Sequence, residues 1–113
     1  MTISHVHCQV RDLAAAVDWF ADVCAVSPSF RNDGLAVFPF DAFTLILDAG
    51  SSDSLVTIGF GSQDCEGDFA AMVKRGAEVM ESPQDRPYGA RVAYLKGPGS
   101  MKIEIEQLLP AGS

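Results

Sequence analysis

Four side chains of this sequence have the types and the spacing to bind a metal ion or to move a proton. His5 and His7 are the only histidines, and Glu104 and Glu106 repeat the same two-residue spacing near the other end of the chain. Residues two apart in a β-strand share a face, so each pair would present its groups together. Imidazole and carboxylate groups are metal ligands and general bases. His5 and Glu104 are therefore the first candidates for site chemistry, metal or catalytic.

The composition narrows the classes of partner. The chain has 113 residues, 48% of them hydrophobic, and carries 15 acidic against 8 basic residues, for a net charge of −7. This acidic balance argues against nucleic acid and against an anionic membrane surface. No apolar run approaches the ~18 residues of a membrane span, and the N-terminus lacks the pattern of a signal peptide. We expect a globular protein whose partner is a small molecule.

The cysteines indicate the compartment. Cys8, Cys24 and Cys65 are odd in number, widely spaced and surrounded by apolar residues. This pattern favours buried thiols over a disulfide framework or a zinc site. We therefore expect a cytoplasmic protein.

The first half of the chain predicts a strand, a helix and three short strands. Residues 3–10 alternate polar and apolar, which is typical of a half-buried strand. Asp12 is a suitable N-cap for a helix with an apolar stripe at Leu13, Val17, Phe20 and Cys24. Strands are expected near 28–32, 35–40 and 42–48. The Gly-, Ser- and Asp-rich run 49–54 predicts a boundary between two modules.

The second half predicts the same order of elements. A strand at 55–61 precedes a helix that Asp64 caps and Gly76 ends, with an apolar stripe at Cys65, Phe69, Met72 and Val73. A short strand at 78–80 should be followed by a loop through Pro83, Pro87 and Gly89. Strands at 91–96 and 101–107 flank a turn at 97–100, and the tail from 108 is expected to be loose.

The two halves align with each other. Four pairs correspond at an offset that grows from 52 to 60 positions: Asp12 with Asp64, His5 with Thr57, Phe38 with Tyr94, and Thr44 with Glu104. We predict an α+β fold of two tandem βαβββ modules, 1–50 and 54–109, within a single domain 1–113. The modules should form a curved mixed sheet around a cleft, with the helices on the outer face.

One face of the predicted sheet is apolar, and the other carries the polar groups and two glycines. Gly59 and Gly61 alternate on the polar face, where glycine weakens a strand unless something must approach its backbone. A ligand pocket explains this placement, and a plain solvated face is the alternative. The expected ligand-binding residues are His7, Phe38, Thr44, Thr57, Gly59, Gly61, Tyr94 and Glu106.

Both ends of the chain resemble one known superfamily. The opening runs from His5 through Asp12 to Trp19-Phe20, and the ending runs from Gly89 through the turn Gly97-Pro98-Gly99-Ser100 to Glu104. Both stretches resemble the vicinal oxygen chelate superfamily, which includes glyoxalase I, bleomycin resistance proteins and extradiol dioxygenases. The turn departs from the Asp-Pro-Asp-Gly of that family.

The resemblance implies a set of four metal ligands, of which this sequence keeps half. His5 and Glu104 fall on two of the positions, whereas Thr57 and Thr44 fall where a histidine and a glutamate are expected. A threonine hydroxyl is a poor ligand for Zn, Ni, Mn or Fe. We therefore expect no cofactor. The alternative is a divalent metal bound by His5 and Glu104 with help from their neighbours His7 and Glu106.

Three functions stay open from the sequence. The first is a metal-free protein of the glyoxalase/bleomycin-resistance type that binds a small organic or drug-like ligand, with a pocket of aromatic residues: Trp19, Phe38, Phe40, Tyr88 and Tyr94. The second is a metal-dependent lyase, isomerase or ring-cleaving dioxygenase using His5 and Glu104, and a metal-free enzyme with either as general base also remains. The third is a non-catalytic interaction domain. A homodimer is expected, because a curved half-barrel leaves an edge and a cleft to cover.

Overall fold

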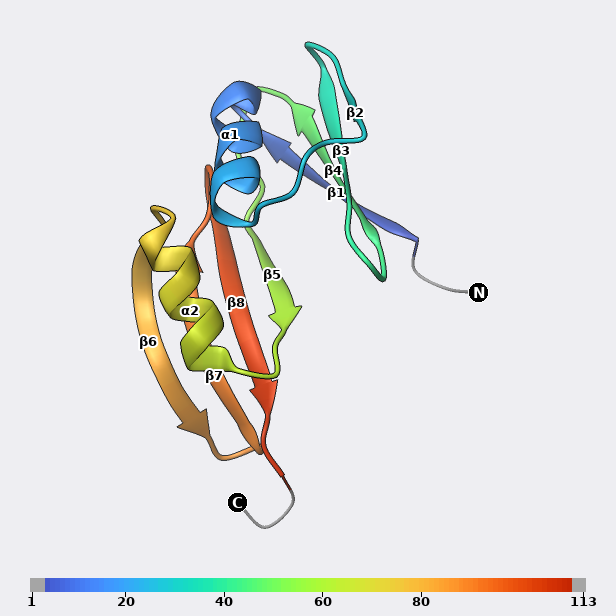
Figure 1. The fold of residues 1–113 in the computed structure, drawn as a ribbon. Coiled ribbons are helices and arrows are strands. Elements are labelled where there is room, and N and C mark those ends of the chain that lie inside the picture. Colours follow the sequence, from blue (N-terminus) through green and yellow to red (C-terminus); the bar gives the residue numbers. More distant parts are fainter. Residues whose placement is uncertain (1–3, 111–113) are drawn as a thin grey trace. The chain divides into compact units, whose positions relative to one another are not determined.

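The computed structural model describes residues 4–110 and divides the chain into two compact units. The first unit runs to Val56 and also includes the turn Pro98–Ser100, and the second comprises Thr57–Gly97 and the residues from Met101 onward. Figure 1 shows the strands and the helix of each unit. The grouping of modules 1–50 and 54–109 into one domain stays a prediction.

The first unit is a four-stranded sheet with one helix. In chain order its elements are β1 (His5–Val10), α1 (Leu13–Val23), β2 (Phe30–Arg31), β3 (Leu35–Pro39) and β4 (Thr44–Ala49). The sheet order is β1-β4-β3-β2, with β1 parallel to β4 and the other pairs antiparallel. Along the chain, α1, β2 and β3 lie between β1 and β4. Parallel neighbours need such a long connection, so β1 can pair in parallel with β4.

The second unit repeats this plan. Its elements are β5 (Val56–Gly61), α2 (Cys65–Lys74), β6 (Glu78–Arg86), β7 (Ala90–Lys96) and β8 (Met101–Leu108). The sheet order is β5-β8-β7-β6, so each strand has the place of its counterpart in the first unit. The predicted α+β fold of two tandem βαβββ modules is confirmed.

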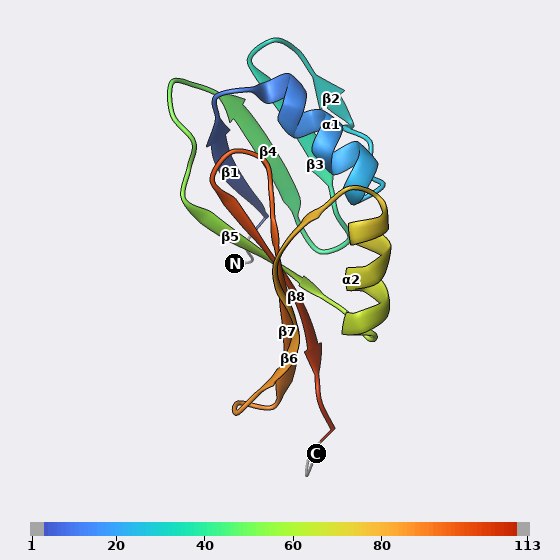
Figure 2. The ribbon, with the colours of Figure 1, turned by 90° about the vertical axis from the view of Figure 1, so that its left-hand side faces the viewer.

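Both helices begin where the sequence predicts. Asp12 and Asp64 are N-caps whose side chains accept hydrogen bonds from the backbone N–H of Ala15, at 3.0 Å, and of Gly67, at 3.1 Å. In Figure 2, α1 lies along the sheet of its own unit. Neither helix in the described part of the chain is long and apolar enough to cross a membrane.

The two helices differ in how well their apolar stripes are covered. α1 buries five residues, and each large one contributes about 1.5–3 kcal/mol to stability: Leu13, Ala16, Val17, Phe20 and Val23. In α2 Cys65 is buried, while Phe69, Met72 and Val73 remain partly exposed, unlike the buried stripe that the sequence predicts.

The apolar face of each sheet packs against its helix, as predicted. Its buried side chains include Cys8, Val10, Leu45 and Leu47 in the first unit and Ile58, Ile103 and Ile105 in the second. Val6, at the open end of β1, is 36% exposed. On the opposite face of both sheets the polar side chains are exposed or half-buried, although Ala90 and Val92 of β7 on that face are buried.

Two cysteines are buried thiols, as predicted. Cys8 and Cys65 are 1% and 0% exposed, and burial raises the pKa of both thiols above its ordinary value. Both are therefore kept protonated and chemically inert at neutral pH. Cys24, at the end of α1, is half-buried.

The predicted loop through Pro83 is wrong. β6 continues from Glu78 to Arg86 and pairs with β7, with register shifts between Val79 and Glu81 and between Glu81 and Gln84. The strand tolerates Pro83 because β6 is the edge strand of its sheet. No strand of the sheet lies on its outer side, so a missing backbone N–H there removes no hydrogen bond between strands. A proline therefore marks a bulged edge strand here and not a break.

The predicted correspondence of Phe38 with Tyr94 is also wrong. Tyr94 pairs with Glu104, whereas Thr44, the counterpart of Glu104, pairs with Pro39. Phe38 pairs with the buried Leu45 and shares its helix-facing side. Its ring is 0% exposed and lies 5.3 Å from that of Phe20, between ring centroids, so Phe38 is a core residue with no surface to offer a ligand.

Candidate functional site

The polar face of the first sheet carries a chain of four interacting side chains. Ser4 Oγ and His5 Nδ1 are 2.7 Å apart, and the His5 and His7 rings meet edge to face with their centroids 5.1 Å apart. His7 Nδ1 is 2.8 Å from Asp48 Oδ2. β1 supplies both histidines, while Asp48 comes from β4, where it pairs with Gln9, two positions after His7.

The contact with Asp48 fixes the orientation of His7. An ionised carboxylate only accepts hydrogen bonds, so His7 donates its Nδ1–H to Asp48 and directs Nε2 away from it. The side chains of His7 and Asp48 are 53% and 39% exposed, so the ring edge is accessible from solvent. This half of the face can therefore accept a hydrogen bond from a ligand.

His5 lies beside Thr44, which occupies another of the ligand positions that the resemblance implies. His5 and Thr44 are register partners on the parallel strands β1 and β4. His5 is exposed and Thr44 is half-buried. The pair thus offers one imidazole and one hydroxyl.

The polar face of the second sheet is organised around Tyr94 and Glu104. These residues are register partners on β7 and β8, and the Tyr94 hydroxyl donates a hydrogen bond of 2.8 Å to Glu104 Oε2. On the neighbouring β5 a Cβ added at Gly59 would lie 3.3 Å from Glu104 Oε1. Gly59 therefore leaves open backbone directly beside the carboxylate.

Charged groups surround the Tyr94 ring. The Lys102 ammonium lies 3.9 Å from the ring centroid, which is a cation–π contact. Glu81 on β6 is the other register partner of Tyr94 and forms an ion pair with Arg86. The hydrogen bond to Glu104, followed by burial and by the charge of Glu104, raises the pKa of Tyr94. Tyr94 therefore stays a neutral hydrogen-bond donor at physiological pH.

The remaining predicted residues of this face are distributed around that pair. Thr57, Gly59 and Gly61 are exposed along β5, and a Cβ at Gly61 would meet no atom within 4 Å. Glu106 is half-buried and pairs with Val92. The second sheet thus brings Gly59, Tyr94 and Glu104 together, and Gly61 and Glu106 flank them.

The other predicted aromatic residues lie in different places. Phe40 stacks on Phe43 with ring centroids 5.8 Å apart, and Tyr88 is 66% exposed in the turn between β6 and β7. Trp19 lies on α1, away from the polar face of its sheet. Of the predicted aromatic residues, Tyr94 is the one that faces the candidate site together with polar partners.

The donors within each unit do not fit a metal ion. In the part of the chain from residue 4 to 110, neither unit groups three or more His, Cys, Asp or Glu side chains for coordination. His5 has Thr44 beside it, and one oxygen of Glu104 accepts from Tyr94. A protein site for Zn usually supplies at least three strong ligands. The convergence of His5 with Glu104 stays a prediction.

Sequence reasoning missed Asp48 and Lys102 as functional neighbours. In the alternating pattern of β4 and β8, both residues fall on the polar face. This alternation is the one signal in the sequence that could have identified them. Their contacts depend on register, however: His7 meets Asp48 across 41 positions of sequence. Local periodicity gives the face of a strand and leaves its pairing undetermined.

The chain has many structural relatives and no match among family models or curated proteins. A glyoxalase/bleomycin resistance protein/dioxygenase from Nocardioides is 22% identical, with a TM-score of 0.85 over 100% of this chain and 87% of that one. A lactoylglutathione lyase from Agrobacterium tumefaciens is 15% identical, with a TM-score of 0.82 over 94% and 92% of the two chains. A glyoxalase/bleomycin resistance protein from Albidiferax ferrireducens T118 is 23% identical, with a TM-score of 0.71 over 93% of this chain and 97% of that one. The protein therefore has the vicinal oxygen chelate fold of the glyoxalase/bleomycin resistance protein/dioxygenase superfamily.

Proposed function

We propose that this protein binds a small organic or drug-like ligand over the polar faces of its sheets, and that it does so without a metal ion. The observation that carries the proposal is the group formed by Gly59, Tyr94 and Glu104. It combines a side-chain-free backbone surface, a flat ring and a carboxylate whose second oxygen lies beside the glycine. A binding site needs such convergent polar groups beside space for the ligand.

The charge of the site defines the class of ligand. Glu81 is neutralised by Arg86, and Lys102 lies over the ring of Tyr94. Asp48, Glu104 and Glu106 are carboxylates on the polar faces, and the whole chain carries a net charge of −7. A neutral or cationic amphipathic molecule suits these surfaces better than an anion does.

The proposal is tested by thermal unfolding with a panel of cationic, neutral and anionic aromatic compounds. A ligand at one hundred times its dissociation constant stabilises the native state by about 2.7 kcal/mol. Glu104→Gln should reduce this stabilisation for cationic compounds, and Lys74→Gln, an exposed change in the last turn of α2, should leave it intact. If every compound leaves the unfolding midpoint unchanged, the protein is better described as an interaction domain.

The alternative is a metal-dependent lyase, isomerase or dioxygenase that uses His5 and Glu104. Elemental analysis of protein purified without chelators distinguishes the two functions. A stoichiometric Zn, Ni, Mn or Fe ion that is lost in His5→Ala would contradict the binding-protein proposal. The expected result is less than a tenth of an equivalent, since His5 and Thr44 offer one strong ligand (about three are needed).

We also propose a cytoplasmic homodimer. Buried thiols at Cys8 and Cys65 suit a reducing compartment, and the first and last strands of each sheet leave edges to be covered. Light scattering at tens of micromolar should give the mass of two chains. A single-chain mass at that concentration would contradict a dimer of about micromolar affinity.

A further inference from the structure

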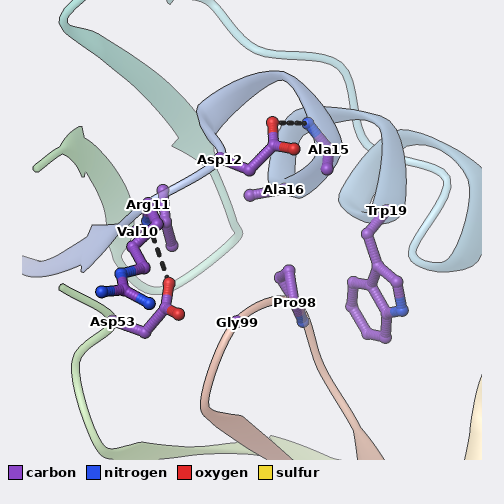
Figure 3. Close-up of a pocket in the computed structure, with 9 residues that line it drawn as sticks. All are labelled: Val10, Arg11, Asp12, Ala15, Ala16, Trp19, Asp53, Pro98 and Gly99. Atoms are coloured by element: carbon purple, nitrogen blue, oxygen red, sulfur yellow. Dashed lines mark hydrogen bonds between the residues drawn. The ribbon is translucent and has the colours of Figure 1, made fainter. Parts of the chain in front are cut away.

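A pocket of about 240 Å³ lies in the first unit, apart from the polar face of its sheet. The end of β1 (Val10 and Arg11), the start of α1 (Asp12, Ala15, Ala16 and Trp19), Asp53 and the turn residues Pro98 and Gly99 line it. Figure 3 shows Trp19 on one side, Asp53 and Arg11 on the other, and Pro98 between them. A volume of this size accommodates one aromatic ring.

Specific contacts hold the walls of this pocket in place. Asp53 Oδ1 accepts a hydrogen bond of 2.9 Å from the backbone N–H of Arg11, and Arg11 Nε donates to the carbonyl oxygen of Ser51 at 3.0 Å. Gly99 has a φ of +61°, and a Cβ there would lie 2.5 Å from Asp53 Oδ1. The turn approaches Asp53 this closely because residue 99 is a glycine, so the pocket exists before any ligand arrives.

The lining combines apolar walls with two carboxylates. Ala15, Pro98 and the indole of Trp19 offer apolar surface. Oδ1 of Asp12 caps α1 and Oδ1 of Asp53 accepts from Arg11, while in residues 4–110 the second oxygen of each carboxylate has no hydrogen-bond partner. Arg11 directs its Nε to Ser51, and Asp12 offsets the positive end of the helix.

We propose that this pocket is a second ligand site and that it binds a one-ring aromatic ammonium ion. The ring lies against the indole of Trp19, and the ammonium group donates to the open oxygen of Asp53 on the opposite wall. This site uses none of the residues assigned to the polar sheet faces. It is therefore independent of the function proposed above.

The test uses the fluorescence of Trp19, which is the single tryptophan of the chain. The probes are benzylamine, benzyl alcohol and benzoate, which share a ring and differ in charge. Benzylamine should change the emission saturably, with a dissociation constant of about 1 mM, as expected for a ligand of this size. Benzyl alcohol should bind about fivefold more weakly, and benzoate should not bind.

Three variants locate the binding. Asp53→Asn retains the acceptor for Arg11 and removes the charge, so benzylamine should bind about fivefold more weakly while benzyl alcohol is unaffected. Ala15→Leu keeps a good helix former and fills the pocket, so all probes should lose their effect. Asp41→Asn is the matched control, because Asp41 is exposed and outside the pocket.

The results separate this inference from the other proposal. Glu104→Gln should leave the benzylamine titration unchanged, even if it abolishes ligand binding on the sheet face. A linear, unsaturable change in emission, a loss of benzylamine affinity in Asp41→Asn as large as that in Asp53→Asn, or tighter binding of benzoate than of benzylamine would each overturn the inference. Should Ala15→Leu fail to fold, Asp53→Asn still decides the outcome.

Discussion

The hydroxyl of Tyr94 donates a 2.8 Å hydrogen bond to the carboxylate of Glu104, its register partner on the adjacent strand. Glu104 is also the residue that the superfamily resemblance identifies as a metal ligand. A tyrosine hydrogen bond holds the carboxylate in place but occupies one of its oxygens. The other oxygen, Oε1, lies beside Gly59 and stays available as an acceptor.

The first prediction concerns the titration of Tyr94. In a Tyr88→Phe background Tyr94 is the one remaining tyrosine, and its pKa should lie above the ordinary value of about 10. Glu104→Gln removes the negative charge and should return the pKa toward that value. The absorbance of the phenolate as a function of pH measures both. A pKa that is the same in the two proteins would contradict the contact.

The shift also has a consequence for stability. The native state holds the Tyr94 proton more tightly than the unfolded chain does, so its contribution is complete below pH ~10 and is lost as the pH rises through the native pKa. Tyr94→Phe should therefore flatten the decline of stability above pH ~10. Denaturant unfolding at several alkaline pH values provides the measurement.

A second prediction concerns the glycines of β5. Gly61→Leu should leave the unfolding free energy unchanged or raise it by up to about 1 kcal/mol, because strand glycines are unfavourable and its Cβ meets open space. Gly59→Leu should displace the Glu104 carboxylate while preserving the fold. Both changes should abolish ligand binding on this face, measured by calorimetry. Unfolding of Gly59→Leu would mean that the position is packed and the face misassigned.

A third prediction concerns the end of α1. Ala25 follows the C-cap Cys24 with a φ of 55°, a conformation that costs an L-residue about 1 kcal/mol. Ala25→Gly should stabilise the protein by about 0.5–1 kcal/mol in urea unfolding. Ala21→Gly, at an exposed position inside the same helix, is the control and should destabilise by about 1 kcal/mol. Destabilisation by both changes would contradict the left-handed conformation of Ala25.

The fourth prediction restores the missing metal ligands. Thr44→Glu combined with Thr57→His should create a site for Zn or Ni together with His5 and Glu104. Its affinity should be about 10–100-fold below that of a natural site, since no neighbouring groups were selected to orient the new ligands. Calorimetric titration of the double variant and of the wild type tests this. A folded double variant without metal binding would mean that these four positions do not converge.

The sequence predicts the elements well and the contacts between them less well. The caps Asp12 and Asp64 and the alternation of β1 are local signals, and the structure confirms them. The length of β6 could not be predicted, because Pro83 indicates a break unless the strand is known to be an edge. Edge position follows from the order of the strands, which local patterns do not contain.

The candidate site shows the same division. The alternation of β8 places Glu104 on the polar face, as predicted. The sequence predicts Phe38 as the counterpart of Tyr94, whereas the strand register identifies Pro39, one residue further along β3. A shift of one residue exchanges the two faces of a strand. For this reason the sequence placed the buried Phe38 in the site. Asp48 and Lys102 fall on the polar faces in the sequence pattern, but their contacts with His7 and Tyr94 depend on which strands pair.

The irregular course of β6 affects how the protein behaves at high concentration. An outer strand with a continuous row of N–H and C=O groups is a template on which other chains can add and grow into fibrils. Pro83 removes one donor from that row, and the two register shifts put its neighbours out of step with any straight incoming strand. β6 therefore ends its sheet in a form that resists aggregation, although Val79 and Met80 on it are exposed and apolar.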